Sequence, residues 1–110
     1  MQIAFHPQPG DVERKLAEIY PDPDQRRAVD VLLADLTDRV KLAVLRLAGA
    51  NMRSVETYAE LARVDYRDVL APAESPHYLA LGLHPDLESA ECLAAIAADI
   101  EQYREWVYGS

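Results

Sequence analysis

The chain has 110 residues and a mass of 12.3 kDa, a size at which a single modest hydrophobic core is expected. Its formal net charge of −8 comes from 19 acidic against 11 basic residues, and the basic residues are scattered along the chain. Because a nucleic-acid-binding protein needs concentrated positive charge, we expect no nucleic-acid partner, whereas the acidic surface is compatible with a basic protein partner.

Cys92 is the only cysteine, so no disulfide can form within the chain, and small secreted domains usually depend on disulfides. The first ten residues contain two prolines and lack the cationic start and apolar run of a signal peptide. No stretch approaches the roughly 20 apolar residues that a membrane-spanning helix needs. We therefore expect a cytoplasmic protein with no membrane partner.

In chain order, residues 1–10 are predicted to form an extended arm, because a proline disfavours helical angles at the residue before it. Ile3 and Phe5 are apolar residues of this arm that can pack onto the body. A short helix is predicted over residues 11–20, with Asp11 as its N-cap and apolar side chains one turn apart. Pro21 ends this helix.

One long helix is predicted next, with Asp22 as N-cap, a proline at its first position and Gly49 as its C-terminal stop. Apolar residues along it alternate steps of four and three and form one stripe: Val29, Leu33, Leu36, Val40, Ala43 and Leu47. Leu42 and Leu45 lie away from this stripe. The segment 40–48 is therefore apolar on more than one side and must be covered twice.

Two explanations of this segment are open. Neighbouring helices of the same chain can pack on both sides, or one side can meet a second subunit. The second explanation makes Leu42 and Leu45 candidate residues of a homodimer interface.

A third helix is predicted from Asn51 to about Ala71, because Pro72 cannot donate a hydrogen bond to the carbonyl four residues earlier. A stripe on this helix includes Tyr66. A short helical turn should then begin at Pro76 and close at Gly82.

The final helix is predicted to begin at Pro85 and Asp86 and to run almost to the end of the chain. Its apolar stripe consists of Leu93, Ile96, Ile100, Tyr103 and Val107. Three main amphipathic helices and short connecting helices predict an all-α fold, a small helical bundle. The body, residues 11–110, is expected to be a single domain that follows the arm.

The densest group of ionisable residues is Asp65, Asp68, Glu74 and His77. Carboxylates together with a histidine suit metal binding and acid–base catalysis, and Glu74 and His77 have the Glu-x-x-His spacing of di-iron bundles. No second copy of that motif is present, and Pro76 interrupts the helix that would carry both ligands. The alternative is a solvated helix face on which Arg67 pairs with a carboxylate.

Aromatic residues concentrate near the C-terminus, where Tyr103, Trp106 and Tyr108 lie within six positions. They either close one end of the bundle or anchor a protein interface, so Tyr103 and Trp106 are further interface candidates. Cys92 is expected to be a small buried apolar group. No motif specifies a cofactor, and none is expected.

Three stretches resemble a group of small uncharacterised bacterial proteins: Arg-Val-Lys-Leu-Ala-Val-Leu-Arg-Leu-Ala from Arg39, Asp-Tyr-Arg-Asp-Val-Leu from Asp65 with Ala73, Glu74 and Pro76, and Gln102-Tyr103 with Trp106. The resemblance covers residues 25 to 107. It implies a helical fold and a bacterial origin, and it assigns no activity and no catalytic residue.

The leading functional hypothesis is a non-enzymatic helical protein-interaction module that forms a homodimer. Its basis is the doubly apolar stretch around Leu42 and the absence of catalytic motifs. The alternative is a metal-binding protein or small enzyme that uses the Asp65, Asp68, Glu74 and His77 group.

Overall fold

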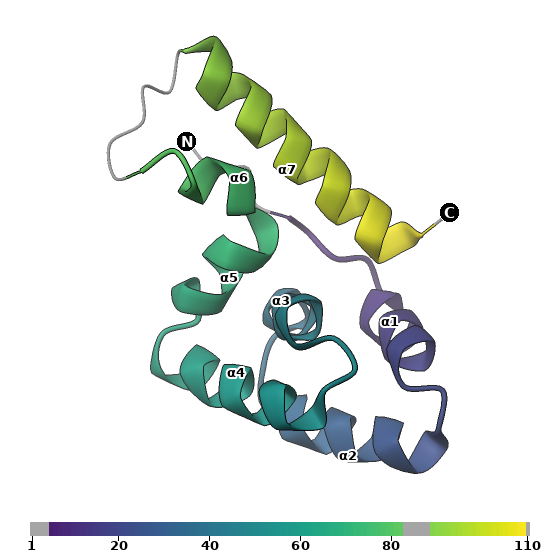
Figure 1. Cartoon of the computed structure of the whole chain (residues 1–110). Helices are drawn as coiled ribbons and strands as arrows, with labels where there is room; N and C mark the ends of the chain where they lie inside the picture. Colours follow the sequence, from purple (N-terminus) through teal and green to yellow (C-terminus); the bar gives the residue numbers. More distant parts are fainter. Residues whose placement is uncertain (1–4, 83–88, 110) are drawn as a thin grey trace.

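Figure 1 shows the computed structural model of the chain, which describes residues 5–82 and 89–109. These residues form helices and no strand, which confirms the prediction of an all-α helical bundle. The helices are α1 (Asp11–Ile19), α2 (Pro23–Leu33), α3 (Asp38–Ala48), α4 (Met52–Val64), α5 (Arg67–Glu74), α6 (Pro76–Leu79) and α7 (Ala90–Tyr108). Within this part of the chain no helix is both long and apolar enough to cross a membrane.

Helix α3 lies at the centre of the bundle and packs against α1, α4 and α5 (Figure 1). Leu42 and Leu45 of this helix are both 0% exposed. Helices of the same chain therefore cover the segment on both sides, and the expectation that these two leucines face a second subunit is wrong. The first of the two explanations, packing within one chain, accounts for their pattern.

The long helix predicted between Asp22 and Gly49 is two helices, α2 and α3. Thr37 separates them with extended backbone angles (φ −71°, ψ 161°), and its hydroxyl accepts a hydrogen bond from the Val40 N–H at 3.4 Å. Arg63 of α4 donates to the Leu32 carbonyl at the end of α2. One of the last carbonyls of α2 thus has a partner outside the helix, and the chain can turn before it starts α3.

The helix predicted from Asn51 to Ala71 is also divided, into α4 and α5. The Asn51 cap is confirmed, since its side chain accepts a hydrogen bond from the Ser54 N–H at 3.1 Å. The break lies at Asp65, whose carboxylate accepts hydrogen bonds from the Arg67 N–H and guanidinium. Tyr66, predicted on the buried stripe, is 54% exposed because the break turns it outward.

Pro72 does not end its helix, contrary to the prediction, because α5 continues to Glu74. The short turn that follows is confirmed, since α6 begins at Pro76 and the Gly82 N–H donates to the Leu79 carbonyl. Gly82 has φ +99°, a value that favours glycine.

In α7 the predicted start at Pro85 and Asp86 lies outside the described residues, and Ser89 caps the described helix by accepting from the Cys92 N–H. Leu93 is 56% exposed, contrary to its place on the predicted stripe. The buried positions of this helix are Cys92, Asp99, Tyr103 and Val107.

The part of the predicted arm that the structure describes, residues 5–10, contains no helix and lies against the body. The Phe5 ring meets the Tyr103 ring edge-on, with 5.0 Å between the ring centroids, whereas Ile3 lies outside the described residues. Asp11, predicted as the N-cap of the first helix, is its first residue, and Gly10 with φ 90° takes the cap position.

Candidate functional site

The four residues of the predicted metal or acid–base cluster are not brought together. Asp65 forms an ion pair with Arg67 at 2.9 Å, and Asp68 is exposed in the first turn of α5. Glu74 and His77 have other partners, described below. In the ranges that the structure covers, no group of three or more His, Cys, Asp or Glu residues could hold a metal ion.

Glu74 is a buried carboxylate that joins α5 to α3. Arg39 donates to both of its oxygens, from Nε to Oε2 at 2.9 Å and from Nη2 to Oε1 at 2.6 Å. The hydrogen bonds to Glu74 raise the pKa of Arg39, so the guanidinium keeps its charge. Glu74 therefore has a structural partner and a neutralised charge.

His77 forms a pair with Asp99, which lies on the buried side of α7. The His77 Nδ1 atom is 2.7 Å from Asp99 Oδ1. The Asp99 carboxylate also accepts hydrogen bonds from the His77 and Tyr78 backbone N–H groups at 2.9 Å. Asp99 is 3% exposed, so these bonds satisfy a carboxylate that water does not reach. In the sequence, nothing indicates that Asp99 accepts hydrogen bonds from α6, because its neighbours on that side of α7 are mostly apolar.

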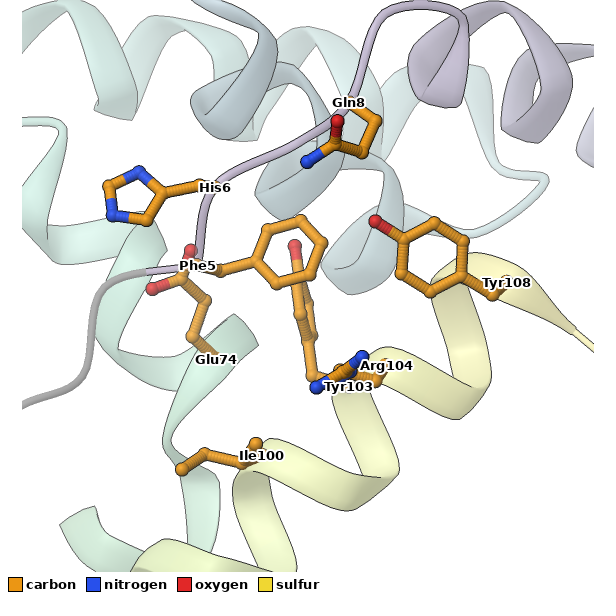
Figure 2. Close-up of a pocket in the computed structure, with 8 residues that line it drawn as sticks. All are labelled: Phe5, His6, Gln8, Glu74, Ile100, Tyr103, Arg104 and Tyr108. Carbon is orange, nitrogen blue, oxygen red and sulfur yellow. The ribbon is translucent and has the colours of Figure 1, made fainter.

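One cavity lies between the N-terminal segment, the end of α5 and the second half of α7, and we call it the α7 cavity (Figure 2). Its volume is about 290 Å³, close to the lower limit for small-molecule sites. The residues that line it are Phe5, His6, Gln8, Glu74, Ile100, Tyr103, Arg104 and Tyr108.

Tyr103 is the deepest polar residue of the α7 cavity. It is 2% exposed, and its hydroxyl has no hydrogen-bond partner among the described residues. Figure 2 shows its ring rising from α7 with the hydroxyl directed toward the N-terminal segment. Burial raises the pKa of this hydroxyl, and the Glu74 carboxylate raises it further, so the group keeps its proton and is a donor.

The aromatic residues near the C-terminus attach α7 to α1 and α3. The Tyr103 and Trp106 ring centroids are 5.6 Å apart, and the Arg46 guanidinium lies 5.5 Å and 5.4 Å from them. The Lys15 ammonium lies 4.5 Å from the Trp106 centroid. Tyr103 and Trp106 therefore pack inside one chain, which is the bundle-closing role that the sequence left open.

A second cavity, the α4 groove, has a volume of about 310 Å³ and lies where α3, α4 and α5 meet. The exposed ring of Tyr66 forms one side. Both charged residues on its wall are already paired, Asp35 with Arg63 at 2.8 Å and Arg39 with Glu74 at 2.6 Å. The residues that line it are Asp35, Leu36, Thr37, Arg39, Val40, Ala62, Tyr66 and Leu70.

The sequence did not reveal either cavity. Phe5, Glu74 and Tyr103 are far apart in the chain, and their meeting depends on tertiary packing that local spacing does not encode. Beside the α4 groove, Arg67 pairs with the Asp65 carboxylate, as the alternative of a solvated helix face expects.

Comparison with known proteins adds no assignment. No family model matches the chain, and no curated protein and no solved structure matches it, so the resemblance to small bacterial proteins and every functional assignment rest on the residues described above.

Proposed function

We propose that the protein is a non-enzymatic interaction module that forms a homodimer through the α4 groove. One observation carries this proposal: the exposed ring of Tyr66 stands beside an apolar groove, and the charged residues of that groove form ion pairs within the same chain. This surface replaces Leu42 and Leu45 as the expected interface. Tyrosine rings with one apolar and one polar end are frequent anchors of protein interfaces.

Charge favours a second copy as the occupant. The chain carries a net charge of −8, so two copies repel each other where their acidic surfaces meet. The α4 groove is free of that repulsion, because Asp35 is neutralised by Arg63 and Arg39 by Glu74. A strongly charged partner, in contrast, finds no unpaired counter-charge on the groove wall.

The geometry also suits a two-fold interface, in which the same patch of both copies meets. Tyr66 stands beside the groove and is 54% exposed, so the Tyr66 ring of each copy can enter the groove of the other. A cytoplasmic location and a bacterial origin are parts of the same proposal. The single cysteine supports the first and the resemblance stated above supports the second.

The test is sedimentation equilibrium of the parent chain, Tyr66→Glu and the control Leu93→Glu. Leu93 is 56% exposed, almost the same as Tyr66, but it lies on α7, away from the α4 groove. We expect the parent and Leu93→Glu to be dimers and Tyr66→Glu to be a monomer with unchanged helix content by circular dichroism. A monomeric parent, or a Tyr66→Glu dimer as tight as the parent's, contradicts the proposal.

A further inference from the structure

The α7 cavity differs from the α4 groove in holding unused hydrogen-bond donors. Tyr103 is 2% exposed, and its buried hydroxyl has no hydrogen-bond partner among the described residues. A buried hydroxyl without a partner is unfavourable, because it loses its hydrogen bonds to water and gains none in return. Arg104, also on the wall, forms no ion pair with any residue that the structure describes.

The charges around the cavity favour an anion, although the chain as a whole is acidic. The charged groups that act on the Tyr103 hydroxyl are Glu74, Arg46 and Arg39. Glu74 is neutralised by its two hydrogen bonds from Arg39. Arg46 lies against the Tyr103 and Trp106 rings and is not part of the cavity wall. Arg104 therefore supplies a positive charge at this wall that no carboxylate of the described residues pairs with.

A second acidic group, Asp11, is neutralised as well. Asp11 accepts a hydrogen bond from the Tyr108 hydroxyl at 3.1 Å, and Arg14 forms an ion pair with it at 3.0 Å. Phe5, Ile100 and the Tyr108 ring supply the apolar part of the wall. The polar side chains of His6 and Gln8 complete it. The cavity thus combines an apolar enclosure with donors and positive charge, the composition of a site for a small amphipathic anion.

We propose that the α7 cavity binds a small carboxylic acid with an apolar body. The body lies against Phe5, Ile100 and the Tyr108 ring. The carboxylate accepts a hydrogen bond from the Tyr103 hydroxyl, and the Arg104 guanidinium at the wall compensates its charge. The α7 cavity and the α4 groove are joined through the Arg39–Glu74 ion pair, but the two tests change other residues, so either proposal can fail alone.

The test uses benzoate as the probe and two analogues that keep the ring, benzyl alcohol and benzylamine. Binding is followed by amide chemical shifts of the full 110-residue chain. We expect benzoate to shift signals of Phe5 and of the second half of α7 in a saturable way. It should bind at least tenfold more tightly than neutral benzyl alcohol, and cationic benzylamine should not bind.

Two buried tyrosines provide matched variants. Tyr103→Phe removes the unpartnered hydroxyl, whereas Tyr20→Phe removes one that donates to the Gly49 carbonyl at 2.9 Å. We expect Tyr103→Phe and Arg104→Gln each to weaken benzoate binding at least tenfold, and Tyr20→Phe to leave it unchanged. The melting temperature should fall in Tyr20→Phe but not in Tyr103→Phe, because only the first loses a formed hydrogen bond.

Three outcomes overturn the proposal. Benzoate leaves the amide signals unchanged at millimolar concentration, or it binds Tyr103→Phe as tightly as the parent. The third is a Tyr103→Phe variant that loses as much stability as Tyr20→Phe. That result means a buried water already satisfies the hydroxyl, so the hydroxyl is not waiting for a ligand.

Discussion

The hydroxyl of Tyr108, at the end of α7, donates a hydrogen bond of 3.1 Å to the carboxylate of Asp11, the first residue of α1. The same carboxylate accepts from the Gln8 N–H at 2.7 Å and from Arg14 at 3.0 Å. Arg14 also donates to the Val107 carbonyl at 3.1 Å. One carboxylate, 2% exposed, therefore connects the N-terminal segment, α1 and the end of α7.

This connection predicts a pH-dependent contribution to stability. Burial raises the pKa of Asp11, but the hydrogen bonds from Gln8, Arg14 and Tyr108 lower it more, so the folded pKa lies below the ordinary value of 3.8. A carboxylate with a lowered folded pKa stabilises the protein above its unfolded pKa, and this stabilisation is lost as the pH falls through the folded pKa. We expect Asp11→Asn to cost about 1–3 kcal/mol at neutral pH and progressively less below about pH 4.

Urea unfolding at a series of pH values measures this difference, with Asp30→Asn as the control. Asp30 is exposed on α2, so its replacement should change stability little at any pH. If the cost of Asp11→Asn is the same at pH 7 and at pH 3, the charge of Asp11 does not contribute and the prediction fails.

The Arg39–Glu74 pair predicts an asymmetric response to mutation. The side chain of Glu74 is 8% exposed and that of Arg39 is 31% exposed. Arg39→Met therefore leaves a buried carboxylate unpaired, and we expect a loss of about 3 kcal/mol in the free energy of unfolding. Glu74→Gln leaves an arginine that reaches water, and we expect a loss of about 1 kcal/mol. Chemical denaturation of both variants measures the two values, and a larger loss for Glu74→Gln contradicts the burial argument.

The helical fold was predictable because its signals are local. Asp22 and Asn51 are caps in the structure as in the prediction, and Pro76 and Gly82 bound the short turn. The apolar spacing that located the helices did not locate their breaks. Val29 lies in α2 and Val40 in α3, and both are buried. An apolar stripe that continues without interruption in the sequence can therefore belong to two separate helices.

The sites were less predictable than the helices because they depend on tertiary contacts. Leu42 and Leu45 form an apolar surface whether their neighbour is the same chain or another, so the sequence left both explanations open. Glu74 and His77 were grouped by their proximity in sequence, yet their partners are 35 and 22 positions away. A periodic pattern identifies a buried face without identifying what covers it.

The break between α2 and α3 can be tested with proline. Asp38 is the first residue of α3, and Thr37 before it has the extended angles that a following proline requires. We expect Asp38→Pro to cost less than about 1 kcal/mol, whereas Asp30→Pro, inside α2, should cost about 3 kcal/mol or more. Urea unfolding compares the two variants. Similar large losses for both would show that one continuous helix spans this region.

The contacts of Asp99 predict that α6 is attached to α7 mainly through one carboxylate. Asp99→Ala leaves the His77 and Tyr78 N–H groups without their acceptors, so we expect their hydrogen exchange to accelerate at least tenfold, about 1.4 kcal/mol. His77→Ala keeps both backbone bonds and should accelerate exchange less. Glu101→Ala, at an exposed position of the same helix, is the control. Because α3 and α4 do not contact this carboxylate through any hydrogen bond, their amide hydrogens should exchange at the rates of the parent. If hydrogen exchange accelerates equally in all helices, Asp99 supports the whole bundle and the prediction fails.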